Sequence, residues 1–309
     1  MAPPLAHRHA VGHLAALDDE ALRTFLAPGG GAVHHGHLGT ALQGAEYDEL
    51  AARIAGVLAP DARTTFESAR ASSEPPNVVA LRRRQVLDAL FWVLLYWHDP
   101  ETYEELVAGE QIHPGLLHAL DLDGRVVADL GAGAGRFTFF AARHAQRVIA
   151  VDAIPPLLQR LDRKVRDQEL DNVETRRGSF TALPLDDGSV DVAVACSSLT
   201  STPPWGGDSA VAEAERVVKP GGDLVVIWPD RPEWFCERGF TYMALPGNAE
   251  MHFRDVASAA RLCAAFYSEE AAQWVRDNDA RVVPFAVLGV SPPSDACFKR
   301  VSGAATPSR

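Results

Sequence analysis

The chain has 309 residues, of which 47% are apolar and 23% charged, and its formal net charge is -12 at pH 7. This composition is typical of a globular protein with enough apolar sequence for one large domain or two small ones. The net negative charge argues against nucleic acid as a partner, because binding to a phosphate backbone requires clustered Lys and Arg. The tight basic run Arg82-Arg83-Arg84 fits a solvated helix face.

Cysteine spacing and hydropathy bear on where in the cell the protein is found. The four cysteines show no C-x-x-C spacing, which favours free thiols over a disulfide framework; they are Cys196, Cys236, Cys263 and Cys297. The longest apolar run, residues 89–97, has nine residues, whereas a membrane-spanning helix needs about 20. The first residues, Met1-Ala-Pro-Pro, lack the basic and apolar regions of a signal peptide. We therefore expect a cytoplasmic protein with no membrane partner.

Residues 1–110 carry helical patterns and almost no strand signal. Apolar residues recur at i, i+3, i+7 and i+10 within 45–58, which predicts one face of a helix. Acids at 18–20 predict the start of a shorter helix, and a longer one is expected over about 79–97. We expect this region to form a helical extension separate from the rest of the chain.

Residues from about 111 to 230 alternate strand patterns with helical ones, which predicts a parallel sheet covered on both faces, and two later apolar runs are expected to supply its last strands. Strands are expected near 125–130, 147–152, 172–177, 191–196, 223–228, 240–245 and 282–290, with helices over 137–145 and 255–278. Residues 302–309 resemble a flexible tail. The chain therefore divides into an N-terminal extension over 1–110, an α/β domain over 111–301 and a tail.

The most informative stretch is 125–136, in which a short buried strand breaks into glycines at alternate positions. Gly131 and Gly133 let the backbone turn tightly and approach a ligand, because a Cβ atom there would collide with it. The next apolar strand ends at Asp152, 21 residues after Gly131. A carboxylate at that strand end can accept hydrogen bonds from both hydroxyls of a ribose.

The glycine spacing disfavours a dinucleotide. A dinucleotide site has the pattern G-x-G-x-x-G, but here Arg136 occupies the third glycine position and Gly135 comes one residue early. Asp129 lies two residues before the first glycine. A carboxylate at that point would repel a pyrophosphate and suit a ligand that carries an ammonium group.

Residues 129–135 resemble motif I, D-x-G-x-G-x-G, of the class I S-adenosylmethionine-dependent methyltransferases. Residues 178–196 resemble the family's passage from the third to the fourth strand, and residues 213–228 resemble its next helix, Pro-Gly-Gly turn and fifth strand. The resemblance is close over roughly 120–229 and is nearest to the small-molecule methyltransferases. It implies S-adenosyl-L-methionine as cofactor and a small-molecule methyl acceptor. It also implies a doubly wound Rossmann-like sheet of seven strands, the last pair antiparallel, with the N-terminal helices as a lid.

The resemblance further implies which residues bind the cofactor. The glycine residues of motif I would line the methionine and ribose portions of the cofactor. The acid before them would interact with its ammonium group, and the acid at the end of the second strand would bind its ribose diol. Residues after the third strand would contact its adenine, and the end of the fourth strand would lie near its methyl group. They are Asp129, Gly131, Ala132, Gly133, Gly135, Asp152, Ser179, Phe180 and Cys196. Many family members place an acid at Ser179, and Phe180 fits ordinary core packing equally well.

The sequence presents no diagnostic catalytic residue. Methyl transfer from a sulfonium needs alignment and exclusion of water, and a general base only where the acceptor holds its proton. His113 and His252 are candidate bases, although a capping or surface role suits His113 better. Trp205 is a candidate for the rim of the acceptor pocket. The cluster His34-His35-Gly-His37 lacks nearby cysteine or carboxylate ligands, so no metal site is expected.

Two other functions stay open at this point. Aminopropyl transfer from the decarboxylated cofactor uses a related fold, but no paired acidic motif for a polyamine follows Cys196. A non-catalytic sensor or scaffold would use Asp129 and Asp152 for cofactor binding in the same way. The acceptor, the atom that is methylated and the oligomeric state do not follow from the sequence.

Overall fold

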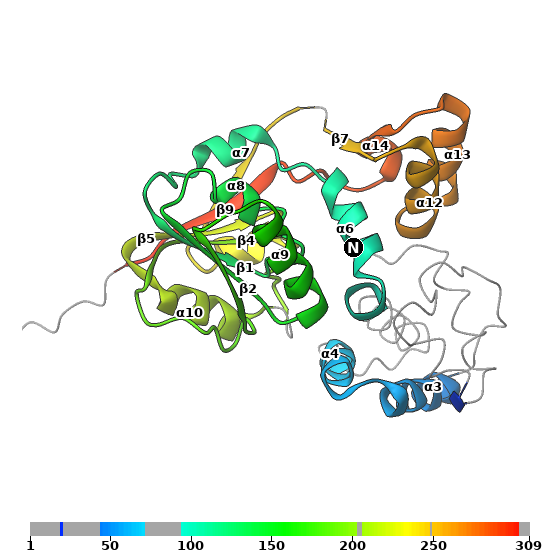
Figure 1. Ribbon diagram of the computed structural model, residues 1–309, viewed down its shortest axis with the longest axis horizontal. Helices are drawn as coiled ribbons and strands as arrows, with labels where there is room; N and C mark the ends of the chain where they lie inside the picture. The colour runs from blue at the N-terminus through cyan, green and yellow to red at the C-terminus, as the bar shows by residue number, and fades with distance from the viewer. Residues whose placement is uncertain (1–18, 21–43, 72–93, 203–205, 248, 303–309) are drawn as a thin grey trace, which may run out of the picture. The chain divides into compact units, whose positions relative to one another are not determined.

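The computed structural model describes residues 19–20, 44–71, 94–202, 206–247 and 249–302 (Figure 1). The chain divides into two compact units. The first comprises the residues up to Glu110 together with 250–290, and the second comprises residues 111–249 and those from Ser291 onward. Several sequence predictions lie outside the described residues: most of the helices begun at 18–20 and expected at 79–97, the His34–His37 cluster, Trp205, and the tail beyond Ser302.

The second unit is built on a seven-stranded sheet of order β3-β2-β1-β4-β5-β9-β6. Its strands are β1 (Val126–Leu130), β2 (Arg147–Asp152), β3 (Val173–Arg177), β4 (Val190–Cys196), β5 (Val218–Ile227), β6 (Thr241–Ala244) and β9 (Asp295–Arg300). Strands β1 to β5 pair in parallel, and β9 is antiparallel to both β5 and β6. The predicted doubly wound sheet is confirmed. The strand order reverses between β1 and β4, where such sheets open a crevice for a ligand.

Helices cover both faces of this sheet (Figure 1). One face carries α7 (Pro114–Ala119), α8 (Thr138–Ala141) and α9 (Pro155–Asp167), and the other carries α10 (Asp208–Val217) and α11 (Pro232–Cys236). Side chains alternate along β1: Ala128 and Leu130 pack in the cluster with α10, whereas Val127 packs with α8. Because both faces are buried, the central strands read as continuous apolar runs. In the described ranges, no helix combines the length and the apolarity needed to cross a bilayer.

Helix α8 is shorter than predicted. The sequence suggested a helix over 137–145, but regular helix stops at Ala141 and gives way to turns. In these turns the amides of Arg143 and His144 donate to carbonyls three residues back, at 3.2 and 3.0 Å.

The polar side chain of Asp191, at the start of β4, ties three neighbouring strands together. Its Oδ2 accepts a hydrogen bond from the amide of Val126 in β1 at 2.8 Å. Its Oδ1 pairs with Lys219 Nζ in β5 at 2.7 Å. These polar contacts hold the strands together at the edge where β1 and β4 begin. The carboxyl ends of the same strands lie at the other edge.

The strand predicted at 282–290 is wrong. Residues Val282–Pro284 form β8, which pairs with β7 (Glu250–His252) in a separate two-stranded sheet. Residues Phe285–Leu288 form helix α14, which ends at Gly289 in a left-handed conformation. The run fails as a central strand because Pro284 lacks the N–H that a sheet interior requires.

The last strand of the large sheet is β9, which the sequence analysis missed. Its residues Ala296 and Phe298 pack on one face of the sheet, and Cys297 packs on the other. Charged residues at 295, 299 and 300 make this strand look less apolar than the run at 282–290. Apolar content alone therefore pointed to the wrong segment.

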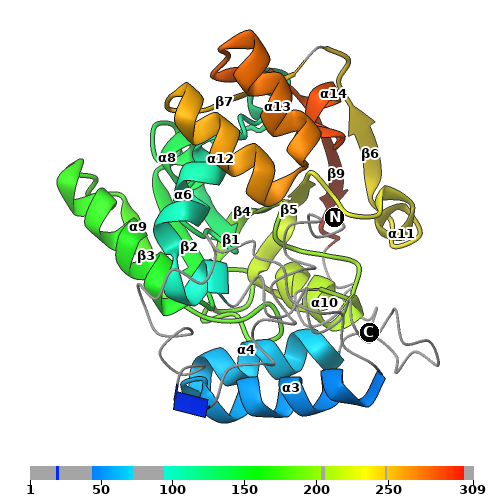
Figure 2. The ribbon, with the colours of Figure 1, turned by 90° about the vertical axis from the view of Figure 1, so that its right-hand side faces the viewer.

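The first unit is mainly helical. It contains α3 (Gly44–Val57), α4 (Pro60–Ala71), the π-helical turn η1 (Leu94–His98), α6 (Pro100–Gly109), α12 (Val256–Phe266) and α13 (Glu269–Asn278), besides β7, β8 and α14. Helices α3 and α4 lie side by side, as do α12 and α13 (Figure 2). The helix predicted at 45–58 corresponds to α3. The predicted helix over 255–278 is two helices, because the Ser268 side chain accepts from the Ala271 amide and starts α13 as an N-cap.

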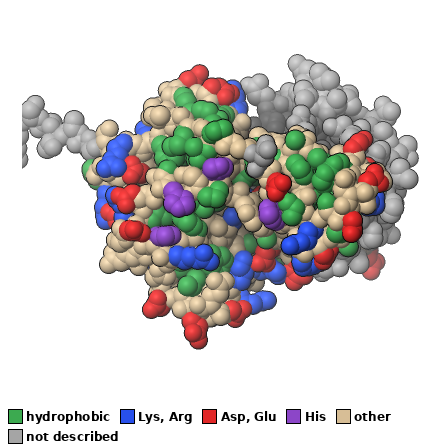
Figure 3. Space-filling model, turned by 90° about the horizontal axis from the view of Figure 1, so that it is seen from above, with side chains coloured by type: hydrophobic (Ala, Val, Ile, Leu, Met, Phe, Trp, Pro, Cys, Tyr) green, Lys and Arg blue, Asp and Glu red, His purple; other side chains and the backbone are tan. Residues whose placement is uncertain are grey.

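Residues 250–290 thus belong with the N-terminal helices, whereas the sequence analysis placed them in the domain over 111–301. Polar contacts join the two parts of this unit: Glu105 of α6 accepts hydrogen bonds from Ser258 and Arg261 of α12, and it pairs with Arg254 at 3.3 Å. In the chain, this segment is an insertion between β6 and β9. On the face seen in Figure 3, acidic and basic side chains are interspersed among apolar ones.

Candidate functional site

The predicted site residues lie at the carboxyl ends of neighbouring strands. Asp129 is in β1, and the glycine loop follows the end of this strand. Asp152 is the last residue of β2, and Cys196 is the last residue of β4. Ser179 and Phe180 follow β3. Parallel strands bring these ends to one edge of the sheet, at the point where the strand order reverses. The fold therefore gathers the predicted residues at the edge expected for a ligand.

The glycine loop after β1 runs through left-handed backbone at alternate residues. Gly131, Gly133 and Gly135 have φ angles of 72°, 54° and 96°. At Gly131 the loop also approaches its neighbours closely: an added Cβ would lie 2.5 Å from Ser198 Cβ and 3.0 Å from Phe180 Cζ. Glycine is required there for both reasons, because a side chain is strained at this φ and has no room.

Asp152 holds this loop in place. Its Oδ2 accepts a hydrogen bond from the amide of Gly133, and its Oδ1 accepts one from the amide of Ile154, each at 2.8 Å. The residue is only 8% exposed, and burial raises the pKa of its carboxyl although hydrogen bonds from the amides of Ile154, Gly133 and Ala153 lower it. An ionised carboxylate can accept about four hydrogen bonds. Three amides therefore still leave Asp152 with some acceptor capacity for a ligand.

Asp129 is enclosed more completely, with 1% of its surface exposed. Its Oδ2 accepts a hydrogen bond from Thr138 Oγ1 of α8 at 2.5 Å. Burial raises the pKa of the Asp129 carboxyl to about 7; the Thr138 hydrogen bond and the Arg136 charge oppose this rise, and the nearby Asp152 adds to it. The two buried carboxyls thus disfavour each other's charge. A cationic ligand group would relieve this repulsion, and a phosphate would increase it.

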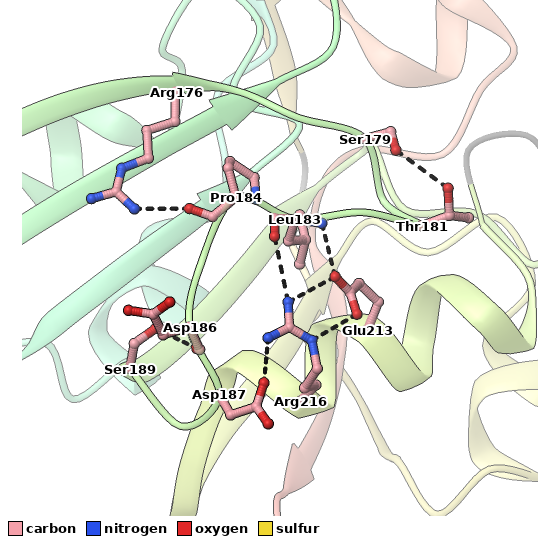
Figure 4. Close-up of polar contacts among 10 residues, drawn as sticks. All are labelled: Arg176, Ser179, Thr181, Leu183, Pro184, Asp186, Asp187, Ser189, Glu213 and Arg216. Atoms are coloured by element: carbon pink, nitrogen blue, oxygen red, sulfur yellow. Dashed lines mark hydrogen bonds and ion pairs between the residues drawn. The ribbon is translucent and has the colours of Figure 1, made fainter.

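The connection from β3 to β4 is anchored to α10 by an ion pair (Figure 4). Glu213 Oε1 accepts from the amide of Leu183 at 2.9 Å and from Arg216 Nη2 at 2.8 Å. Arg216 also donates to the carbonyl of Leu183 at 3.4 Å and pairs with Asp187 at 2.5 Å. This clamp was not assigned from the sequence, although its i, i+3 spacing within α10 was a visible signal.

Ser179 and Phe180 lie at the start of the anchored connection. Ser179 is exposed, and its Oγ lies 3.3 Å from Thr181 Oγ1. Phe180 is half-buried against the core cluster that includes β1 and β4, and it reaches Gly131. Phe180 therefore packs in the core and also borders the glycine loop. This position is compatible with both interpretations given above, core packing and contact with the cofactor.

The ends of β4 and β5 have strained backbone. Ser197 follows β4 with φ 54° and Trp228 follows β5 with φ 56°, a conformation that is costly for residues other than glycine. The two ends are joined by a hydrogen bond from the Ser197 amide to the Ile227 carbonyl at 2.9 Å. Ser198 Oγ donates to the carbonyl of Leu130 at 2.7 Å and so ties this turn to β1.

Cys196 contacts the glycine loop region through its backbone carbonyl, whereas its side chain is buried. It is 8% exposed and belongs to the apolar cluster beneath α8. Its carbonyl oxygen accepts a hydrogen bond from Arg136 Nη2 at 3.4 Å. The contact with the neighbouring loop is thus made by the backbone of Cys196.

The two histidine candidates have different surroundings. His113 Nδ1 accepts from the Gly115 amide at 3.0 Å, so this residue caps α7. His252 is in β7, within the first unit and not the unit of the sheet. Within the ranges that the structure describes, no three His, Cys, Asp or Glu side chains gather as metal ligands would.

Comparison with known proteins shows what the segment around this site is similar to. Residues 127–222 match a family model described as a methyltransferase domain. An uncharacterized methyltransferase-like protein of Schizosaccharomyces pombe is 38% identical over 109 residues, which cover 35% of this chain and 40% of that protein. An uncharacterized methyltransferase of Mycobacterium tuberculosis is 35% identical over 118 residues, covering 37% and 45%. The matched segment thus spans less than half the length of these curated relatives.

Among solved structures, a SAM-dependent methyltransferase from Aquifex aeolicus is similar at a TM-score of 0.40 and 20% identity. The alignment covers 50% of this chain and 93% of that one. A putative methyltransferase from Bacillus halodurans aligns at a TM-score of 0.44 and 16% identity, over 62% and 98% of the two chains.

Gly131→Ala is expected to lower the free energy of unfolding by about 2–5 kcal/mol, because left-handed strain costs about 1–2 kcal/mol and overpacking about 1–3 kcal/mol. Gly188→Ala is the matched control: Gly188 also has a positive φ of 55°, but the nearest atom to its added Cβ is 3.7 Å away. Chemical denaturation of both variants measures the difference. Equal losses for the two would show that crowding at the strand ends contributes nothing.

Proposed function

We propose that the protein is a class I methyltransferase that transfers the methyl group of S-adenosyl-L-methionine to a small-molecule acceptor, and the match of residues 127–222 to a methyltransferase domain supports this proposal. The observation that carries the proposal is the pair of buried carboxyls, Asp129 and Asp152, on either side of the glycine loop. Two neighbouring buried acids favour a ligand that brings positive charge and repel one that brings phosphate. S-adenosyl-L-methionine is a nucleoside with a sulfonium and an ammonium group and no phosphate.

Each residue of the site has a role in this proposal. Asp152 accepts hydrogen bonds from the ribose hydroxyls, and Asp129 compensates the ammonium group of the methionine end. The residues of the glycine loop, Gly131, Ala132, Gly133 and Gly135, leave room for the ligand beside the backbone. Ser179 and Phe180 border the adenine, and the backbone at Cys196 borders the methyl group. The positions of these residues at the sheet edge and the polarity of each group support these assignments, which the resemblance to the family implies.

Positioning is the main task of these residues in catalysis. When bound, the cofactor supplies a methyl group that is activated by its positively charged sulfur and leaves a neutral thioether. The chain has to hold the acceptor in line with the carbon–sulfur bond and to keep water away. The rigid turn at Ser197 and Ser198, tied to β1 by the hydrogen bond to Leu130, is suited to fixing the acceptor side. An acceptor that keeps its proton also needs a base within hydrogen-bond reach.

We assign the helices of residues 1–110 to a lid, and the insertion 250–290 joins them in this role. The connectivity supports the assignment: β6 runs in the same direction as β5, since both are antiparallel to β9. The chain therefore leaves the sheet at the end of β6 and returns at the start of β9, and both points lie at the edge that carries the glycine loop. We also place the protein in the cytoplasm, because all four cysteines are free thiols.

Turnover assays test the proposed function directly. The purified chain is incubated with S-adenosyl-L-methionine and fractionated metabolite extracts, and release of S-adenosylhomocysteine is measured. Release that depends on one extract fraction is expected. Tight binding of the cofactor without turnover on any fraction would favour a sensor or scaffold instead. Absence of any cofactor binding would contradict the proposal.

Asp152→Ala is expected to weaken binding of S-adenosylhomocysteine by about 100-fold, because two charge-assisted hydrogen bonds to the ribose are lost. Isothermal titration calorimetry measures the change. Asp186→Ala is the control, since Asp186 is an exposed acid in the same unit. Unchanged affinity in a folded Asp152→Ala protein would remove Asp152 from the ribose site.

Binding of S-adenosylhomocysteine is expected to depend on pH through Asp129, whose carboxyl has a pKa raised to about 7 by burial. Below pH 7 this carboxyl holds a proton, which the ammonium group of the ligand must displace. Affinity should therefore fall about tenfold per pH unit below 7 and level off above it. Bound ligand should release a proton, detected as a dependence of the binding enthalpy on the buffer.

Two variants check this pH dependence. Asp129→Asn should remove it, because an amide does not titrate in this range. Thr138→Val should move the transition to higher pH, since the Thr138 hydrogen bond lowers the pKa of Asp129. A pH profile that is the same in Asp129→Asn and the unmodified protein would assign the titration to another group.

A further inference from the structure

Two of the four cysteines lie at one contact, between helix α11 and strand β9. Helix α11 follows β5 and lies against β6 and β9 (Figure 2). Cys236 is its last residue and is exposed, whereas Cys297, within β9, is fully buried. The other two cysteines lie elsewhere, because Cys196 packs on the opposite face of the sheet and Cys263 belongs to the first unit.

The geometry of α11 directs the Cys236 side chain toward Cys297. Cys297 Sγ donates to the carbonyl of Pro232, the first residue of α11, at 3.9 Å. In an α-helix the carbonyl of one residue faces the amide four residues later, which for Pro232 is the amide of Cys236. Side chains on a helix also lean toward its N-terminus, and residues i and i+4 share a face. The carbonyl that Cys297 contacts therefore lies beneath the Cys236 side chain.

The two thiols differ in their surroundings. Burial raises the pKa of the Cys297 thiol to about 12, and the nearby Cys236 and Asp295 and a hydrogen bond between the two thiols add to this rise. A thiol with so high a pKa stays protonated, and its burial keeps dissolved oxidants away from it. The exposed Cys236 is the thiol that an oxidant reaches, and Cys297 is the thiol beside it.

The backbone on both sides of this contact is held in place. Cys297 lies in a strand that is paired on both sides, with β5 and with β6. On α11 the buried ring of Phe235 packs edge-on against Phe240, with ring centres 5.4 Å apart. The amide of Gly239 donates to the Cys236 carbonyl at 3.0 Å. A disulfide requires two cysteines whose backbones are already close and correctly oriented, and these contacts maintain such an arrangement.

We propose that Cys236 and Cys297 are a reversible modification site, at which hydrogen peroxide converts the two thiols to a disulfide that clamps α11 to β9. In the first step Cys236 sulfur attacks the peroxide, the O–O bond breaks, and Cys236 becomes a sulfenic acid while one water is released. Cys297 sulfur then attacks Cys236 sulfur. The S–S bond forms, the S–O bond breaks, and the hydroxyl leaves with the Cys297 proton as a second water. The pair loses two electrons and two protons in all, and a dithiol reductant reverses the reaction.

Counting the thiols of the full chain tests the proposal. The protein is treated with hydrogen peroxide, then denatured and labelled with N-ethylmaleimide, and its mass is measured. The reduced protein should carry four labels, one for each cysteine, and the oxidised protein two. Dithiothreitol should restore all four, and digestion should yield a peptide pair that joins Cys236 to Cys297. A sulfinic acid at Cys236, a disulfide between two chains, or four labels after treatment would overturn the proposal.

Three variants make the result specific. Cys236→Ser changes an exposed side chain and should carry three labels before and after peroxide. Cys297→Ala should accumulate the sulfenic acid at Cys236, which dimedone traps. Cys263→Ala is the matched control, because Cys263 is also buried, with its pKa raised to about 12, and lies in the other unit. Its labels should fall from three to one. A loss of two labels in Cys236→Ser would assign the disulfide to other cysteines.

The stability of the oxidised protein tests the clamp. The bond closes residues 236–297, which include β6 and the insertion 250–290, into a loop, and a closed loop restricts the unfolded chain. Peroxide should therefore raise the Tm of the unmodified protein by about 5–15 °C and leave that of Cys236→Ser unchanged. An oxidised protein with an equal or lower Tm would show that the bond strains the fold, which contradicts a clamp. Neither measurement involves the cofactor, so the outcome is independent of the proposed methyl transfer.

Discussion

The site depends on one contact, the hydrogen bond from the Gly133 amide to the carboxylate of Asp152 at 2.8 Å. It joins the loop after β1 to the end of β2 and satisfies an amide that is buried in the turn. With the loop held in this way, Gly131 lies close against Ser198 and Phe180, so the ends of β1, β3 and β4 meet around it. Ser198 completes the arrangement through its hydrogen bond to Leu130. A single carboxylate thus sets the distances between several strand ends.

This arrangement is costly for folding. Burial raises the pKa of both Asp129 and Asp152, so the folded chain holds two acids whose charge it disfavours. Linkage gives the sign: a carboxyl with a raised pKa in the folded state destabilises that state increasingly as pH rises above its unfolded value near 4. The acids make sense as a preformed environment for a cation, which recovers on binding what folding loses.

The sequence predicted those parts of the site that depend on neighbouring residues. A strand followed by alternate glycines, and an acid at the end of the next strand, determine the loop and its ligand edge almost by themselves. The contacts of Arg136 could not be predicted in this way, because Cys196 lies 60 residues further along the chain and Trp228 is on another strand. Strand β9 was missed for the same reason, because it pairs with β5, a segment far away in the chain. Its charged residues also obscure the alternation of apolar and polar side chains that marks a strand.

The two parts of the site, the glycine loop with its acids and the ends of β4 and β5, therefore differ in how far local sequence determines them. The glycine loop, Asp129 and Asp152 are set by local sequence, and they fall within the matched segment 127–222. Trp228 lies just beyond that segment, and the insertion between β6 and β9 follows it. Ser197 and Trp228, with left-handed backbone on adjacent strands, mark the side of the site away from β2. The residues to which we assign cofactor binding thus lie within the matched segment, whereas Trp228 and the chain between β6 and β9 lie beyond it. A resemblance carried by the glycine loop reaches only the part of the site that local sequence specifies, because the contacts of the other part join segments far apart in the chain.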